Sequence, residues 1–130
     1  MYSGFVAVGV GAAVGAWMRW GLGIWLNPLF ARLPLGTLAA NLIGGLIMGV
    51  VLEVLARVTT LAPEWRLLLT TGFLGGLTTF SAFSGEIATL LLHGDWRWAA
   101  LGIVLHVVGS LAMTLAGVFL VRWLFFGALA

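Results

Sequence analysis

Four long apolar stretches, separated by short polar breaks, constrain the fold of this chain more than any other feature. A helix needs about 20 residues to cross the hydrocarbon core of a bilayer. The chain is cut into pieces of that length by breaks at Asn27-Pro28, Pro34, Pro63 and His93-Gly94-Asp95. We therefore expect four transmembrane helices in one membrane domain over residues 1–130, with spans at about 4–26, 35–57, 65–92 and 98–125.

Composition excludes most other classes of protein. Hydrophobic residues make up 62% of the chain and charged residues only 8%, whereas a soluble domain carries about 25% charged residues. The chain has no cysteine, which excludes disulfides and thiolate metal sites, and its six arginines form no basic tract that would bind nucleic acid. The N-terminus lacks a basic n-region, which favours a retained helix over a signal peptide. These features predict an all-α, multi-pass protein of the cell (inner or plasma) membrane, embedded in the lipid bilayer.

The third apolar stretch contains an interruption, Gly72 to Phe83, with the sequence GFLGGLTTFSAF. Backbone groups left without hydrogen bonds in lipid cost several kcal/mol each unless protein, water or an ion satisfies them. Discontinuous helices of this kind occur where ions or small solutes cross membranes. We therefore predict that the third helix is broken at mid-membrane, with bare backbone put to use at Gly75, Gly76, Thr78 and Thr79.

The arginines give no preferred orientation in the membrane. Four spans put both termini on one side, and the arginines then divide equally between the faces, with Arg57, Arg66 and Arg122 on one and Arg19, Arg32 and Arg97 on the other. Because a Lys/Arg bias between loops normally sets topology, two alternatives remain. Either other signals set the orientation, or the chain inserts both ways and assembles as an antiparallel, dual-topology homodimer.

Small residues at helical spacing favour close helix contacts. Gly11 and Gly15 in the first span, and Gly45 and Gly49 in the second, are each four residues apart, as in helix-contact motifs of membrane proteins. A chain of this length also has few helices with which to surround a pathway across the membrane, which independently favours a dimer.

Asn41 is a polar residue in the second span, where it shares a face with Thr37, Gly44 and Gly45. It has two interpretations. Most lone membrane asparagines make an interhelical hydrogen bond. Alternatively, its amide offers two N–H donors to a permeating anion.

Two phenylalanines follow the interruption at a spacing of three residues. Phe80 and Phe83 therefore project from one helical face, with Thr79 and Glu86 on or beside it. The rings either pack against neighbouring helices or attract an anion with their positive edges, without a charge that would trap it.

The fourth span carries a stripe of small or polar residues, which are Gly102, His106, Ser110 and Thr114. The stripe is either a polar helix contact or a pore lining, and His106 can in principle ligate haem. Two charged residues lie well inside the spans. Arg19 can snorkel to the interface, and Glu86 is expected to flank a water-filled vestibule.

Together these residues resemble the Fluc (CrcB) family of fluoride channels over nearly the whole chain. The matching segments are GAAVGAWMRW (Gly11 to Trp20), GTLAANLIG (Gly36 to Gly44) and, most specifically, GFLGGLTTFSAFSGE (Gly72 to Glu86). The resemblance implies a fluoride-selective ion channel, not an enzyme, that exports cytoplasmic fluoride down its electrochemical gradient. It also implies an antiparallel homodimer with two pores.

The resemblance further implies roles for single residues. Asn41 would hydrogen-bond fluoride, and Phe80 and Phe83 would point their ring edges at it. Backbone carbonyls of Gly75 and Thr78 would hold a structural Na⁺ at the dimer centre. An outer polar track would include Thr79, Ser81, Ser84 and Glu86, whereas Arg19 belongs to the first-helix motif without an assigned role.

The chain departs from the family pattern at two places. Ala82 stands where members often have serine or threonine, which removes any hydroxyl role there. Gly102 and His106 stand where some members have tyrosine and serine, so Ser110 is the expected pore residue of the fourth helix.

Two other functions remain as alternatives. A proton-coupled small multidrug-type transporter has a similar size and span number but needs a carboxylate in the first helix, which this chain lacks. A haem-bearing or structural membrane subunit depends on His106 alone. An enzyme is not expected, because no nucleophile–base pairing is visible among four acids, two histidines and no cysteine.

Overall fold

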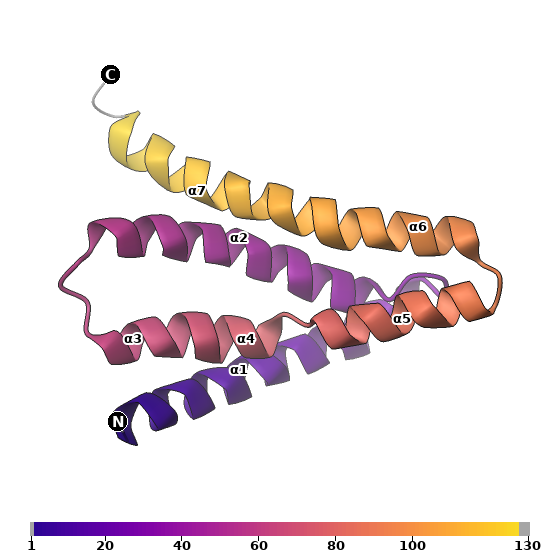
Figure 1. The fold of residues 1–130 in the computed structure, drawn as a ribbon, viewed down its shortest axis with the longest axis horizontal. Coiled ribbons are helices and arrows are strands. Elements are labelled where there is room, and N and C mark those ends of the chain that lie inside the picture. Colours follow the sequence, from indigo (N-terminus) through magenta and orange to yellow (C-terminus); the bar gives the residue numbers. More distant parts are fainter. Residues whose placement is uncertain (1, 128–130) are drawn as a thin grey trace.

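The computed structural model describes residues 2–127, and their regular secondary structure is entirely helical. Four helical stretches are long and apolar enough to cross a membrane, namely Tyr2–Leu29, Leu35–Arg57, Pro63–Leu92 and Trp96–Phe125. The start of α1 (Tyr2–Leu26) and the end of α7 (Ser110–Phe126) lie at the same end of the bundle (Figure 1). The expected all-α architecture with four spans is confirmed.

The helix boundaries fall at the breaks that the sequence contains. Pro28 lies in the short 3₁₀ turn Asn27–Leu29 after α1, and Pro34 precedes α2 (Leu35–Arg57). Pro63 begins α3 (Pro63–Leu67), a position where its missing N–H is not needed. Gly94 forms the turn between α5 (Phe80–Leu92) and α6 (Trp96–Val104) with a φ of 78°, a left-handed conformation that glycine adopts without strain.

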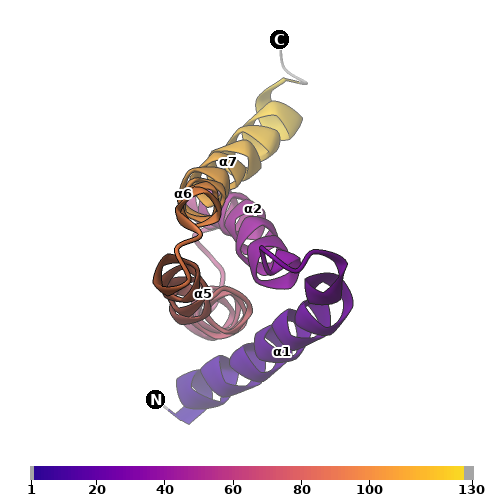
Figure 2. The same ribbon diagram turned by 90° about the vertical axis from the view of Figure 1, so that its right-hand side faces the viewer.

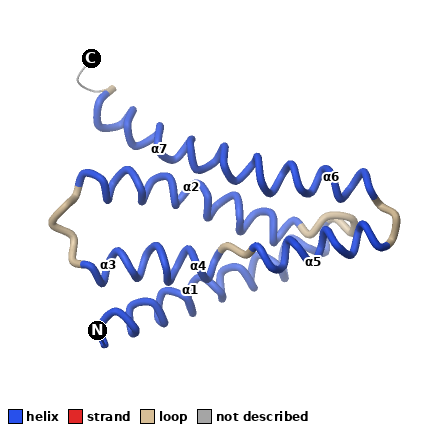
Figure 3. The backbone as a smooth tube through the Cα atoms, viewed as in Figure 1, coloured by secondary structure: helices blue, strands red, loops and turns tan. Residues whose placement is uncertain are grey.

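The third span consists of several segments. After α3 comes a π-helical segment, Leu68–Leu74, followed by the short α4 (Gly75–Leu77) and then α5 (Phe80–Leu92). Thr78 and Thr79 between α4 and α5 have extended backbone, visible as a short loop in Figure 3. The expectation that bare backbone begins at Gly75 and Gly76 is wrong, since both residues are helical.

The glycines of the third span serve helix packing instead. A Cβ atom at Gly76 would collide with the backbone of Ala12, and one at Gly72 would lie 2.9 Å from the carbonyl oxygen of Val8. Glycine is therefore needed because α1 passes directly against this part of the third span. Close approach, and not local unwinding, explains these two positions.

The glycine pairs of the first two spans also lie at backbone contacts. Gly11 and Gly15 face the third span, where a Cβ atom on either would reach within 2.7 Å of a backbone nitrogen, of Phe73 and of Leu77 respectively. Gly45 and Gly49 face α7, where added Cβ atoms would collide with the backbone of Ser110 and Thr114. The prediction that these pairs mark close helix contacts is confirmed.

Helix α2 lies between its neighbours, with α1 on one side and the fourth span on the other (Figure 2). The fourth span comprises α6 (Trp96–Val104), a π-helical segment Leu105–Gly109, and α7. A core cluster forms where α2 meets the third span, from Ala40, Val51, Leu74 and Leu77. This central position brings α2 into contact with both the extended residues and the fourth span.

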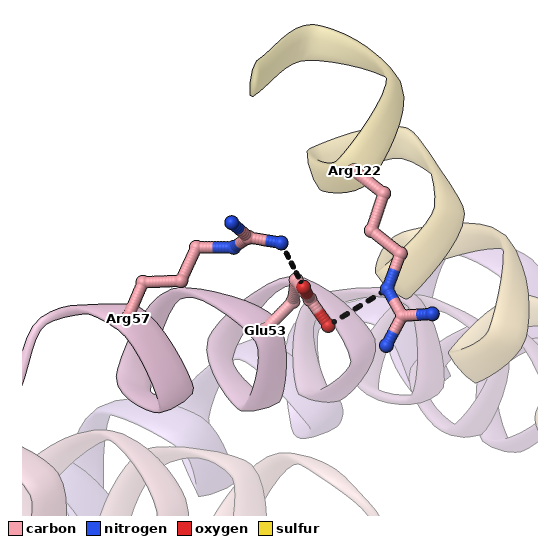
Figure 4. A network of polar contacts seen from close by, with 3 residues as sticks. All are labelled: Glu53, Arg57 and Arg122. Atoms are coloured by element: carbon pink, nitrogen blue, oxygen red, sulfur yellow. Dashed lines mark hydrogen bonds and ion pairs between the residues drawn. The ribbon is translucent and has the colours of Figure 1, made fainter. Parts of the chain in front are cut away.

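At one end of the bundle, a buried carboxylate on α2 forms ion pairs that connect α2 to α7. Glu53 on α2 is only 8% exposed, and it accepts hydrogen bonds from Arg57 and, at 3.1 Å, from Nε of Arg122 on α7 (Figure 4). A buried charge needs such partners, because an unpaired one is strongly destabilising. Arg32 pairs with Asp95 at 3.7 Å at the opposite end. These pairings agree with the expected division of Arg57 and Arg122 from Arg32.

Candidate functional site

A cavity of about 440 Å³ lies where α2, the extended residues and the fourth span meet. It brings together five of the residues expected to line a pore, which are Asn41, Thr79, Phe80, Phe83 and Ser110. Its lining also includes Thr78, Thr114 and His106, but no aspartate, glutamate, lysine or arginine. The cavity is therefore polar in places but carries no permanently charged side chain.

Asn41 makes two hydrogen bonds to the extended backbone at Thr79, and we call this pair of bonds the clamp. Its Oδ1 accepts a hydrogen bond from the N–H of Thr79 at 2.8 Å, and its Nδ2 donates to the carbonyl oxygen of the same residue at 3.1 Å. The N–H of Thr79 has no partner in the helical ladder, and the amide oxygen satisfies it. The carbonyl of Thr79, as that of the N-cap, begins the ladder of α5 and accepts from the amide as well. Asn41 thus makes the interhelical contact that was one of its two interpretations, and hydrogen bonding to an anion stays a prediction.

The hydroxyl of Thr79 starts the next helix. Its Oγ1 accepts from the N–H of Ala82 at 3.2 Å, which caps the N-terminus of α5. The same oxygen lies 3.2 Å from Oγ of Ser81. Thr79 is therefore fixed by its backbone through Asn41 and by its side chain through α5.

The two phenylalanine rings differ in their surroundings. Phe83 is buried and Phe80 is 75% exposed, and the rings meet edge to face with their centroids 5.4 Å apart. On its other side the Phe83 ring stacks on the imidazole of His106 at 4.6 Å. His106 in turn places its Nδ1 3.0 Å from Nδ2 of Asn41.

Ser110 has the one buried side-chain polar atom without a hydrogen-bond partner in the described part of the chain. Its Oγ is completely buried, although the cavity lies directly beside it. A buried hydroxyl without a partner is rare in proteins and points to a ligand or water that completes it. This finding favours the expected placement of Ser110 on a polar pathway.

Glu86 lies outside this cavity. Its carboxylate accepts a hydrogen bond of 2.5 Å from Oγ1 of Thr37, and the two side chains are partly buried between α2 and α5. A second cavity of about 570 Å³ is lined in part by Thr37, Arg19 and Thr79. Thr79 therefore lines both cavities, which places the clamped residue between them, whereas Ser81 and Ser84 are exposed and line neither.

Arg19 reaches into the bundle, where its Nε donates to the carbonyl oxygen of Gly76 at 3.1 Å. In the sequence, Gly76 lies between Gly75 and Thr78, whose carbonyls are the expected sodium ligands. Within residues 2–127, no group of three His, Cys, Asp or Glu side chains could hold a metal. Gly75 is suited to close approach, because only Thr70 O lies within 4 Å of an added Cβ atom, at 3.9 Å.

The pattern of polar residues did not reveal three of these contacts. The sequence placed His106 in a polar stripe and Thr37 on the face of Asn41, but it did not predict that His106 touches both Asn41 and Phe83. It also did not pair Thr37 with Glu86. The available signal was the shared helical spacing, with Thr37 one turn before Asn41 and Glu86 nearly one turn after Phe83.

The sequence matches a family model described as CrcB-like protein, Camphor Resistance (CrcB), over residues 6–118. The chain belongs to the CrcB family. Relatives named "Fluoride-specific ion channel FluC" include one from Nitrosospira multiformis, 56% identical over 91% of this chain and 92% of its own. One from Aromatoleum aromaticum is 58% identical over 87% and 86%, and one from Pseudomonas aeruginosa is 51% identical over 95% and 98%.

Membership of the CrcB family confirms the resemblance and decides between the expected classes. The CrcB family is one of ion channels and not of enzymes, and the four spans make this member a multi-pass membrane protein, in a bacterium of the inner membrane. The transporter alternative is not favoured, since α1 contains no acidic residue. Haem ligation by His106 is not favoured either, because the family is one of ion channels.

Replacing Asn41 in this CrcB protein by alanine should release the extended segment. The N–H of Thr79 would lose its partner, and an unsatisfied buried group costs about 1–3 kcal/mol. Amide exchange at Thr79 in detergent micelles should accelerate. Thr70→Val, which removes only a hydroxyl bonded to Arg66 O, is the matched control and should leave Thr79 protected. Equal exchange at Thr79 in Asn41→Ala and the parent protein would show that the clamp is unimportant.

Proposed function

We propose that this CrcB protein is a fluoride-selective channel that lets cytoplasmic fluoride leave the cell down its electrochemical gradient. The observation that carries the proposal is the cavity of about 440 Å³, which combines an amide, hydroxyls and aromatic rings without a fixed charge. The names of relatives more than half identical to this chain support the choice of ion.

The chemistry of the cavity suits a strongly hydrated small anion. Fluoride needs hydrogen-bond donors to replace its water, and Ser110 has a hydroxyl without a partner beside the Asn41 amide. The ring edges of Phe80 and Phe83 add weak positive potential. A full positive charge in a medium of low dielectric constant would bind the anion too tightly to release it. Neutral donors therefore fit conduction better than an arginine would.

The third helix, on this proposal, is broken at mid-membrane and the break serves conduction. Support comes from the position of Thr78 and Thr79, whose extended backbone lies near the centre of the span Pro63–Leu92. Thr79 presents its hydroxyl there while Asn41 takes up its backbone groups. Ser81, Ser84 and Glu86, together with Thr37, would continue the route toward the membrane surface.

The working unit would be an antiparallel homodimer with two pores. Support comes from polar side chains that a single chain leaves uncovered, since Ser81 and Ser84 are exposed within the span Pro63–Leu92, where Gly75 is exposed as well. Exposed polar backbone and side chains are not tolerated against lipid. A second copy that covers this face of the third span would satisfy them, and the equal arginine counts allow that copy to insert in the opposite direction.

A structural Na⁺ would lie between the two copies, held by carbonyl oxygens of Gly75 and Thr78 from each. The open space at Gly75 and the lack of a side-chain metal cluster in residues 2–127 support backbone ligation. Purification in a sodium-free buffer with a large organic cation should lower the thermal stability of the dimer. Added sodium should restore it. If adding more of the organic cation raised the thermal stability as much as sodium does, the sodium site would be excluded.

Fluoride efflux from proteoliposomes, measured beside chloride efflux, tests the proposed function. Fluoride should leave at least about tenfold faster than chloride, which corresponds to a difference of about 1.4 kcal/mol. Ser110→Ala should slow fluoride because it removes an available donor. Thr89→Val, which removes a hydroxyl bonded to Gly85 O outside the cavity, is the control and should conduct normally. Equal rates for the two anions would refute a fluoride-selective channel.

Dual topology can be tested with reporters fused to the C-terminus. Two reporters are used, of which one is active only in the cytoplasm and the other only outside it. Because the arginines are divided evenly, both fusions should be active in the same host. Adding two lysines to one end of the bundle, beside Arg57, should shift the balance toward the fusion that keeps this end cytoplasmic. Activity of a single reporter in the unmodified chain would exclude insertion in both directions.

A further inference from the structure

His106 lies at a distinct place in the fourth span. It belongs to the π-helical segment Leu105–Gly109, and π-helical turns occur frequently at functional sites. The residue is only 5% exposed, yet it lines the cavity. Its two contacts there are the Phe83 ring and the Asn41 amide.

The contacts of Asn41 determine the state of the imidazole. The N–H of Thr79 can only donate, so the atom 2.8 Å away must be the amide oxygen of Asn41. The atom facing His106 at 3.0 Å is therefore the amide nitrogen, which donates. Nδ1 of His106 must then be the acceptor, so the ring is neutral and carries its proton on Nε2.

The two N–H groups of Asn41 consequently have different roles. One donates to the carbonyl oxygen of Thr79 at 3.1 Å and stabilises backbone that has left the helix. Breaking that bond would remove one of the two hydrogen bonds that hold Thr79 to α2. The other donates to a neutral side-chain nitrogen at the edge of the cavity. Only the second N–H can be transferred to an ion without disturbing the clamp.

We propose that His106 is a positioning residue for fluoride, acting through Asn41. Its Nδ1 holds one N–H of Asn41 at the cavity while no ion is present, and fluoride replaces Nδ1 as the acceptor when it arrives. A charged acceptor makes the stronger hydrogen bond, so fluoride can displace the imidazole. The imidazole takes the N–H back when the ion leaves, which aids release. This inference rests on the fluoride-channel function proposed above.

A purely structural role for His106 makes a different prediction. If the imidazole only filled space against Phe83, an apolar residue of similar volume would replace it best. If Nδ1 is needed as an acceptor, asparagine should replace it best, because Oδ1 of asparagine occupies nearly the position of Nδ1. The two substitutions therefore rank in opposite orders under the two explanations.

Fluoride efflux of three variants in proteoliposomes tests this ranking. His106→Asn should conduct within about threefold of the parent protein, and His106→Leu should be about tenfold slower, as expected for loss of one oriented hydrogen bond. His93→Asn makes the same change at a histidine whose Nδ1 contacts only Thr89 O at the end of α5, and its flux should be unchanged. Flux of His106→Leu equal to or above that of His106→Asn would overturn the proposal.

Nitrogen NMR tests the same inference without a change at His106. The chain has two histidines, so a ¹⁵N-histidine sample of the His93→Asn variant reports on His106 alone. Without fluoride, Nε2 should be protonated and Nδ1 unprotonated. Saturating fluoride should move the Nδ1 resonance toward the position of an imidazole nitrogen without a hydrogen bond, and saturating chloride should leave it in place. A proton on Nδ1, or an Nδ1 resonance that fluoride does not move, would overturn the proposal.

The two experiments separate failure of this inference from failure of the proposed function. A parent protein that carries no fluoride overturns the function and the exchange at Asn41 together. Normal fluoride selectivity with a protonated Nδ1 overturns only the role of His106.

Discussion

The hydrogen bonds between Asn41 and Thr79 are the interaction on which the rest of the site depends. Thr79 has a backbone donor without a helical partner close to the carbonyl that begins α5, and backbone groups inside a membrane span must be satisfied by protein. A carboxamide is complementary to that pair, because it carries an acceptor and a donor side by side. With Thr79 held in this way, its side chain is free to cap α5 and to face the cavities.

The clamp works only because small residues let the helices approach. Gly44 lies one turn after Asn41, and a Cβ atom there would collide with the side chain of Thr78. Gly76 brings the third span against α1, where Arg19 takes the Gly76 carbonyl. The glycines of the third span that face α1 therefore do not break the helix, although glycine often does. They let the helical part of the third span pack closely against α1, and the extended residues follow directly after that part.

The sequence predicted the elements well and the contacts between them poorly. Apolar runs and proline breaks identify spans, because length and hydrophobicity are local properties. The GFLGGLTTFSAF motif located the unusual segment, yet helix persists through Gly75 and Gly76, since glycine at a crowded interface looks the same as glycine at a break. The bonds from Asn41 to Thr79 and His106 join residues 38 and 65 positions apart, and the bond from Thr37 to Glu86 joins residues 49 apart. No local pattern specifies such partners.

A pathway for fluoride has to offer donors without leaving them unsatisfied when the ion is absent. A bare N–H in an apolar cavity would be costly, while one bound to a strong acceptor would not be given up. The neutral Nδ1 of His106 lies between these extremes, since it pairs with the Asn41 N–H yet is a weaker partner than an anion. Ser110 satisfies the same requirement less completely, because its buried hydroxyl has no acceptor of its own. If fluoride crosses this cavity as proposed, its conduction depends on the acceptors that hold the donors while no ion is present, as well as on the donors themselves.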